Sequence, residues 1–184
     1  VAGFTNEGGV GGKITFLQNI TGMWILQRLM AEWSEEGAPQ EYGPLLAAAA
    51  EVKTDALIPV DDEAFQNPQS MQRAINAYCH SHGMTVPQTK AETACVVLQS
   101  LAARYARAVS PLNDMLPQPI RCLHIIGGGS QNQLLNTLTQ QALGIPVMAG
   151  PVEATGMGNI LTQALAKGEV SGVGEMRQIV RDSM

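Results

Sequence analysis

The last third of the sequence constrains the fold more than any other part. The apolar run Ile120–Ile126 predicts a buried strand, the glycine triplet Gly127–Gly129 follows it, and helical periodicity extends over Asn132–Leu143. A second short strand is expected at Ile145–Ala149 and another helix at Ala154–Lys167. A strand, a glycine loop, a helix, a strand and a helix in this order predict a β-α-β-α unit with two parallel strands. The expected fold class is therefore α/β.

The first two thirds of the sequence predict a hairpin followed by helices. Residues 2–18 hold two short β-rich runs around the glycine-rich turn GGVGG, and a further strand is expected near Leu57–Val60. The expected helices cover Ile20 to Trp33, Tyr42 to Lys53, Ser70 to His80 with Gly83 as its C-cap, and a long segment that opens with the capping box Thr89/Glu92 and ends at a loop bracketed by Pro111, Pro117 and Pro119.

Composition narrows the function classes. A net charge of −5, the lack of a long basic run and an aromatic content of 4% argue against a dedicated nucleic-acid binder. No apolar run reaches about 18 residues, which excludes a membrane-spanning helix. Three cysteines are too few for a disulfide-held secreted scaffold, and no signal-peptide pattern opens the sequence, so we expect a cytoplasmic protein. Because the sequence opens with Val and stops inside a helical pattern, we also expect a fragment of a longer protein.

The glycine triplet is the strongest chemical feature. Three missing Cβ atoms let backbone N–H groups approach an anion or a flat ring closely, and the following helix directs its positive end to the same place. The triplet also lies at the carboxyl end of a predicted strand, where α/β folds bind ligands. A tight turn that binds nothing is an equally good interpretation of these residues alone. Neither the P-loop nor the G-x-G-x-x-G fingerprint is matched.

Other polar clusters favour structural roles. Cys79, His80 and His82 lie at a helix end without a second ligand cluster, so we expect a surface helix end rather than a metal site. Cys79 and Cys95 lie on successive predicted helices, and a disulfide between them is left open because it depends on geometry. The acidic run 61–63 predicts a solvated turn.

Two long segments resemble a known family. GGGSQNQLLNTLTQQALGIPVMAGPVEATGMGNILTQALAKG looks like the C-terminal signature of the FGGY carbohydrate kinases. TNEGGVGGKITFLQNITGMWILQRLMAEW is similar to the same region of family members that act on L-rhamnulose. The resemblance spans residues 1–184. It implies an actin-like ATPase (ribonuclease-H-like) C-terminal domain with helical insertions.

The resemblance also implies an activity. Enzymes of this family transfer the γ-phosphoryl group of ATP, with Mg²⁺, to a sugar hydroxyl, here O1 of L-rhamnulose, in a cleft between two domains. ATP lies mainly on the C-terminal domain, whereas the sugar and an Asp general base lie mainly on the N-terminal one. This chain resembles only the C-terminal half. We therefore expect no catalytic residue in it, a metal bound mainly through the nucleotide, and no turnover without the missing N-terminal domain.

Three residues correspond to site residues of the family. Asn19 matches a sugar-contacting Asn, Gln27 a nucleotide-contacting Gln and Gly128 a nucleotide-binding Gly. Without the resemblance, Asn19 is a good helix N-cap and Gln27 a residue of a solvated helix face.

Three residues close to Gly128 are assigned to the same site because of their place in the sequence, and not because they match a site residue of the family. Gly127 and Gly129 are expected to form the same wall, and Asn132 is expected to contact the base.

Two alternatives stay open. The chain is either part of a kinase, for L-rhamnulose or for another sugar such as xylulose, fuculose or glycerol, or a non-catalytic domain that binds a nucleotide or a partner protein. A missing partner domain would also leave an apolar face exposed, which predicts self-association in solution.

Overall fold

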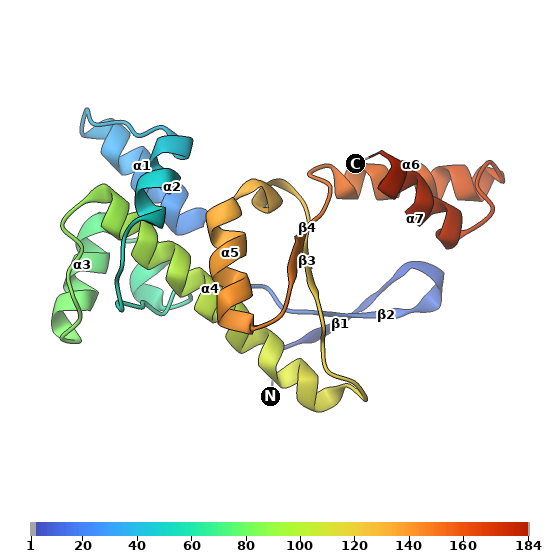
Figure 1. Cartoon of the computed structure of the whole chain (residues 1–184), viewed down its shortest axis with the longest axis horizontal. Coiled ribbons are helices and arrows are strands. Elements are labelled where there is room, and N and C mark those ends of the chain that lie inside the picture. Colours follow the sequence, from blue (N-terminus) through green and yellow to red (C-terminus); the bar gives the residue numbers. More distant parts are fainter. Residues whose placement is uncertain (1–2, 184) are drawn as a thin grey trace.

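The computed structural model describes residues 3–183, and Val1, Ala2 and Met184 lie outside the described part. Most helices gather at one end of the molecule, the strands lie in the middle, and the last two helices lie at the other end (Figure 1). The elements in chain order are β1 (Thr5–Gly8), η1 (Val10–Gly12), β2 (Ile14–Leu17), α1 (Trp24–Glu35), α2 (Tyr42–Ala50), η2 (Glu63–Phe65), α3 (Met71–Ser81), α4 (Lys90–Met115), β3 (Leu123–Ile125), η3 (Gly128–Gln131), α5 (Gln133–Leu143), β4 (Val147–Ala149), α6 (Ala154–Lys167) and α7 (Val173–Asp182).

The β-α-β-α unit is confirmed. Strands β3 and β4 pair in parallel, with Leu123 opposite Val147, and α5 connects them. Gly144 ends α5 in the left-handed conformation, at a φ of 68°, where a side chain would be strained. Helix α6 then covers the predicted range. The chain therefore belongs to the α/β class.

The prediction that the first of these strands is buried was wrong. Strand β3 is only three residues long, His124 within it is exposed, and Ile126 just after it is 57% exposed. The apolar run signals burial, but the sheet described here has two strands, so it is too narrow to bury every apolar side chain that it carries.

The predicted hairpin is confirmed for the described residues. Strand β1 pairs antiparallel with β2, with Thr5 opposite Leu17, and Gly11 and Gly12 turn the chain at φ values of 70° and 73°. This hairpin and the β3–β4 pair form two separate sheets. Ile14 and Phe16 of β2 are more than half exposed, and the Phe4 ring lies 5.9 Å from that of Phe16, so one face of the hairpin is only partly covered by apolar side chains.

The apolar core lies at the helical end of the molecule. Helices α1, α3 and α4 bury side chains against each other, including Leu29, Ile75 and Leu98. The capping box of α4 is confirmed, since Thr89 accepts a hydrogen bond from the backbone N–H of Glu92 and the Glu92 carboxylate accepts one from the N–H of Thr89. The core is thus built from helices whose ends the sequence marks clearly.

Helix α1 starts later than predicted, and the strand near 57–60 is absent. The first residue of α1 is Trp24. The apolar periodicity that begins at Ile20 therefore starts before the helix, and residues in that part line a cavity. Residues 57–60 are extended, but the N–H of Ile58 donates to the Ser100 hydroxyl (2.9 Å) rather than to another strand. The alternating burial of residues 57–60 therefore results from packing against α4 and not from pairing with a strand.

Helix α4 runs through Pro111, which was expected in its exit loop. A proline in a helix interior removes one backbone hydrogen bond and costs about 3 kcal/mol. The second half of α4 lies along α5, and Asn113, beyond the proline, accepts a hydrogen bond from the Ile120 N–H (2.8 Å). These tertiary contacts offset the local cost. Among the residues described, no helix combines the length and the apolar character needed to cross a membrane.

Candidate site at the glycine loop

The glycine loop leaves β3 through a conformation that only glycine adopts easily. Gly127 has a φ of 79° and a ψ of −170°. Its N–H donates to the carbonyl of Pro151 (3.0 Å), while the Gly150 N–H donates to the Ile125 carbonyl (2.8 Å). These two bonds hold the exit of β3 against the exit of β4. The first glycine is therefore required by the fold itself.

The second and third glycines are not required by the fold. Gly128 and Gly129 have no positive φ, and both are exposed. A Cβ atom built on either of them would meet no other atom within 4 Å. Since the described chain would tolerate side chains here, the absence of two successive side chains leaves bare backbone facing open space.

Hydrogen bonds hold the loop from inside. The backbone N–H and the hydroxyl of Ser130 both donate to the Gly127 carbonyl, at 3.0 and 2.8 Å. The Asn136 side-chain amide donates to the Ser130 carbonyl (2.8 Å), and the Asn132 N–H donates to that of Gly129 (3.2 Å). The loop is thus fixed by its own residues and by the first turn of α5.

Asn132, which we expect to contact the base, has a buried side chain in this structure. Its side chain is 2% exposed and caps α5, because Oδ1 accepts the Leu135 N–H (3.0 Å). Its Nδ2 donates to the Tyr42 hydroxyl (3.0 Å). In this arrangement the amide points into the protein and not toward the open side of the loop. The sequence carried the relevant signal, since Asn is a preferred N-cap residue directly before a helix.

Asn19 and Gln27 both lie on the surface near the start of α1. Asn19 is exposed in the segment between β2 and α1, and Gln27 is exposed in the first turn of α1. The N-cap of α1 is Met23, so the alternative prediction that Asn19 caps this helix was wrong. Gln27 is compatible with both of its predicted roles.

An apolar cavity joins this segment to the glycine loop. Its volume is about 540 Å³, and its lining includes Ile20, Gly22 and Met23 from the segment before α1 as well as Gly129 from the loop. The structure therefore brings the 19–27 region and the 127–132 region together, although about 100 residues separate them in the sequence.

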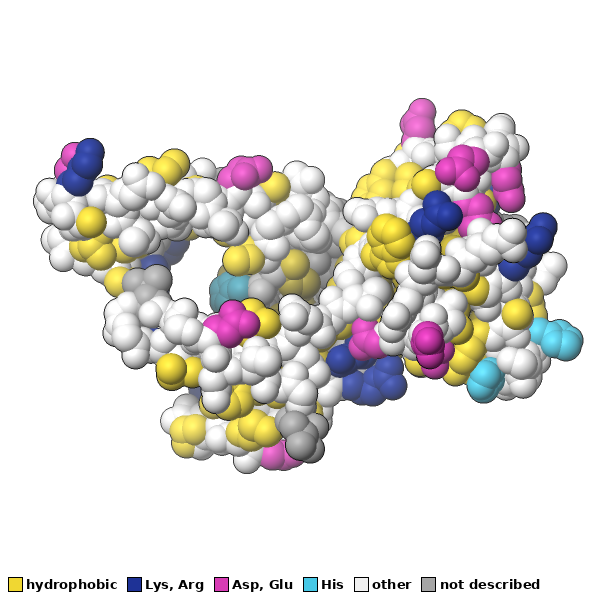
Figure 2. All heavy atoms as spheres, turned by 180° about the vertical axis from the view of Figure 1, so that it is seen from behind, with side chains coloured by type: hydrophobic (Ala, Val, Ile, Leu, Met, Phe, Trp, Pro, Cys, Tyr) yellow, Lys and Arg dark blue, Asp and Glu magenta, His cyan; other side chains and the backbone are white. Residues whose placement is uncertain are grey.

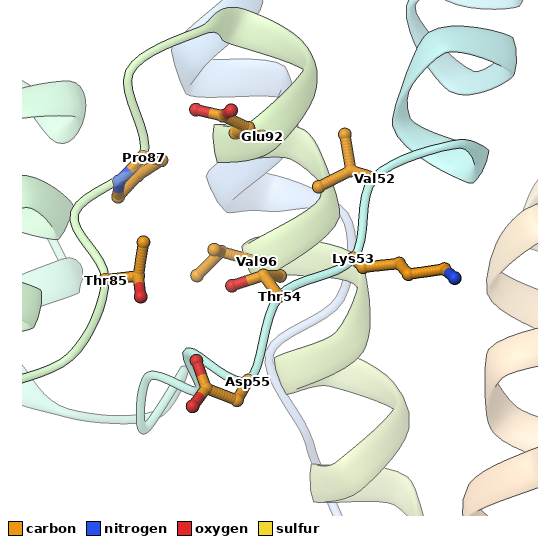
Figure 3. A pocket seen from close by; sticks show the side chains of 8 residues that line it. All are labelled: Val52, Lys53, Thr54, Asp55, Thr85, Pro87, Glu92 and Val96. Atoms are coloured by element: carbon orange, nitrogen blue, oxygen red, sulfur yellow. The ribbon is translucent and has the colours of Figure 1, made fainter.

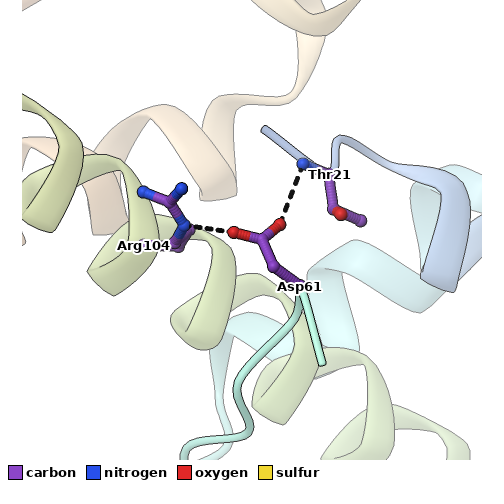
Figure 4. A network of polar contacts seen from close by, with 3 residues as sticks. All are labelled: Thr21, Asp61 and Arg104. Atoms are coloured by element: carbon purple, nitrogen blue, oxygen red, sulfur yellow. Dashed lines mark hydrogen bonds and ion pairs between the residues drawn. The ribbon is translucent and has the colours of Figure 1, made fainter. Parts of the chain in front are cut away.

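A carboxylate that the sequence analysis assigned to a solvated turn fixes the segment before α1. Asp61 forms an ion pair with Arg104 of α4 and accepts the backbone N–H of Thr21 at 3.2 Å (Figure 4). Burial raises the pKa of Asp61, but the hydrogen bonds from Arg104 and Thr21 outweigh it, so the pKa lies below its ordinary value. No local pattern marks Asp61, because its partners lie about 40 residues away on either side.

A second cavity, at the helical end, contains none of the predicted site residues. Figure 3 shows its side chains, among them Lys53 and Asp55 on one segment and Glu92 at the start of α4. Its volume is about 370 Å³. Glu92 is already committed to the capping box, and hydrogen bonds from the backbone N–H groups of Gln88 and Thr89 lower its pKa. The residues that line this cavity present no bare backbone comparable to that of the glycine loop.

The cysteines and histidines stay apart from the site. Cys79 and Cys95 are buried free thiols, so the structure contains no disulfide between them. Burial raises the pKa of both thiols. His82 stacks on Tyr78, with 4.0 Å between the ring centroids. Within residues 3–183 no three His, Cys, Asp or Glu side chains are grouped to hold a metal ion.

Comparison with known proteins identifies the family. Residues 1–167 match the C-terminal domain of the FGGY family of carbohydrate kinases. The chain belongs to this family.

Within the family, the chain is similar to rhamnulokinases. It is 43% identical to that of Bacteroides thetaiotaomicron over 182 residues, 44% to that of Pectobacterium carotovorum over 180 and 40% to that of Bacillus subtilis over 183. These alignments cover 97–98% of the chain but only 36–37% of each relative. The chain therefore spans little more than a third of the length of the curated relatives it matches.

Proposed function

We propose that the chain belongs to the nucleotide-binding, C-terminal half of a kinase that transfers the γ-phosphoryl group of ATP to O1 of L-rhamnulose. One observation carries this proposal. Gly128 and Gly129 present bare backbone at the carboxyl end of β3, although nothing in the described chain requires glycine there. At the carboxyl end of a parallel strand, where α/β folds bind ligands, glycines that the fold does not need leave room for a ligand against the backbone. The relatives named rhamnulokinase suggest the sugar.

Each proposed site residue has a role that suits its position. Gly127 gives the loop its bend, and Gly128 and Gly129 form the wall for the nucleotide. Gln27 is exposed on α1 and offers an amide to the nucleotide, whereas Asn19 offers a donor and an acceptor to a sugar hydroxyl. We assign Asn132 to hold the wall from behind, because its amide is buried. The metal, Mg²⁺, would be held mainly by the phosphates of ATP.

The proposal treats residues 1–184 as one domain of an actin-like fold that works with an N-terminal sugar-binding and catalytic domain. Phosphoryl transfer requires positioning and electrostatic stabilisation from both sides of a cleft. The 184-residue chain alone is therefore expected to bind nucleotide weakly and to phosphorylate no sugar. A cytoplasmic location belongs to the same proposal and is supported by the buried free thiols of Cys79 and Cys95.

Calorimetric titration with ADP tests the nucleotide site. Gly128→Val places a side chain in the open space before the wall, so it should abolish ADP binding without lowering the melting temperature. Gly174→Val is the matched control, because Gly174 is also exposed, has no positive φ and lies in α7. Equal ADP affinity in the wild type and Gly128→Val would remove the site.

The sugar is tested separately. Joined to the N-terminal part that its relatives possess, the chain should phosphorylate L-rhamnulose with a higher kcat/KM than xylulose, fuculose or glycerol. A preference for another sugar would correct the substrate and leave the kinase assignment intact. Turnover by the 184-residue chain alone would contradict its assignment as half of the enzyme.

A further inference from the structure

A single buried amide connects the glycine loop to two helices that are distant in the sequence. Asn132 follows the loop directly, and its Nδ2 donates to the hydroxyl of Tyr42, the first residue of α2 (3.0 Å). The same Nδ2 lies 3.9 Å from the Sδ of Met23, the N-cap of α1. The beginnings of α1, α2 and α5 therefore meet at one side chain.

The direction of the Tyr42 hydrogen bond follows from the other contact of the amide. The Oδ1 atom of Asn132 accepts the Leu135 N–H and so must face α5. This places Nδ2 toward Tyr42, whose hydroxyl accepts the hydrogen bond. Burial raises the pKa of Tyr42, more than the hydrogen bond from Asn132 lowers it, so the hydroxyl is neutral at physiological pH.

We propose that Tyr42 is a positioning residue for the nucleotide wall, acting through Asn132. The chain of contacts is short: Tyr42 orients the Asn132 amide, Asn132 caps α5 with Oδ1, and its backbone N–H holds the Gly129 carbonyl (3.2 Å). In this role Tyr42 acts through Asn132 and needs no contact of its own with the nucleotide. The inference rests on the proposed function, since it names a residue that supports the same site.

The hydroxyl is the part of Tyr42 that this role needs. The residue is 40% exposed, so ring packing is incomplete and a phenyl ring would fill the same space. Without the hydroxyl, a buried N–H of Asn132 would face only the weak acceptor Met23. A buried donor without a partner is unfavourable, so the amide would rotate to find one. This rotation would weaken the hydrogen bond that Oδ1 accepts at the start of α5.

The test compares Tyr42→Phe with Tyr78→Phe in the 184-residue chain. Tyr78 lies on α3 and packs its ring against Phe65 and His82, with no hydrogen bond of its hydroxyl among the described contacts. Two readouts are used: hydrogen exchange at the Ser130 and Asn132 amides, and the ADP affinity. Tyr42→Phe should speed exchange at both amides and raise the Kd for ADP about fivefold. Tyr78→Phe should change neither.

A second variant keeps the proposal testable if Tyr42→Phe is simply less stable. Asn132→Ser retains an N-cap oxygen but has no amide to reach Tyr42. In this background Tyr42→Phe should have no further effect on exchange at the Ser130 amide, because the two residues act as a unit. Additive effects of the two changes would overturn the proposed link.

The failures of the two proposals are distinguishable. If the wild type binds ADP and Tyr42→Phe binds it equally well with unchanged exchange, Tyr42 has no positioning role. If the wild type does not bind ADP, the nucleotide site fails and with it the role of Tyr42 in binding. Faster exchange at the Ser130 and Asn132 amides would in that case show a purely structural link.

Discussion

At the scale of single residues, the three glycines of the loop have different reasons to be glycine. Gly127 adopts a backbone conformation that is costly for any other residue, whereas Gly128 and Gly129 adopt ordinary ones and face open space. The first of the three successive glycines is therefore required by the backbone conformation. We assign the missing side chains of the other two to ligand access.

This difference predicts different effects of alanine. Gly127→Ala should lower the free energy of unfolding by about 1–3 kcal/mol, because a Cβ strains the backbone at a φ of 79°. Gly128→Ala should leave it unchanged or raise it slightly, since alanine reduces the freedom of the unfolded chain. Urea denaturation measures both. Similar losses at the two positions would show that the loop has a different conformation.

The lowered pKa of Asp61 predicts that its contribution to the free energy of unfolding is lost in acid. Its folded-state pKa is lowered, so the contribution is present above the unfolded pKa of about 4 and is lost as the pH falls through the folded pKa. At neutral pH Asp61→Asn should cost about 0.5 kcal/mol, a small value because the side chain is 39% exposed. The difference from the wild type should shrink in melts at acid pH.

The control for Asp61 is Asp55→Asn, which removes another exposed carboxylate from the segment between α2 and η2. Hydrogen exchange at the Thr21 amide should increase in Asp61→Asn and not in the control. Unchanged exchange at Thr21 would mean that Asp61 does not hold the segment that contains Asn19.

At the scale of elements, the sequence predicts well wherever local chemistry decides. The capping box of α4, the αL glycine that ends α5 and the bounds of α6 all depend on residues within a few positions of each other. Prediction failed where distant residues decide: the segment 57–60 bonds to Ser100 instead of a strand, and Pro111 is held in α4 by contacts with α5. Asn132 combines both kinds of contact, because its cap on α5 is local whereas its partner Tyr42 lies 90 residues earlier.

Pro111 gives a direct test at this scale. Pro111→Ala restores the missing backbone donor within α4 and should raise the free energy of unfolding, by about 1–3 kcal/mol. Pro117→Ala, a change in the loop after α4, is the control and should have little effect. If Pro111→Ala were neutral or destabilising, α4 would not continue through this position in solution.

At the scale of the whole molecule, the chain has two small sheets and an incompletely covered apolar surface. Hydrophobic side chains lie at the surface on the side opposite to that of Figure 1 (Figure 2). Ile14, Phe16, Ile126, Met148 and Ile160 are each more than half exposed. Exposed apolar groups beside unpaired strand edges favour association.

The 184-residue chain is therefore expected to self-associate. Light scattering at increasing concentration should give an apparent mass above the 19.5 kDa of one chain. Phe16→Lys and Ile160→Lys together should reduce the association without unfolding the protein, because both residues are exposed. A monomer at all concentrations would contradict this expectation.

We expect an adenine nucleotide to lie against the bare backbone of Gly128 and Gly129. A crystal structure of the chain with ADP tests it most directly. We predict density for ADP over these two glycines, with the Asn132 side chain still buried behind them. ADP bound elsewhere, or a loop whose open side is filled by a neighbouring residue, would contradict the account.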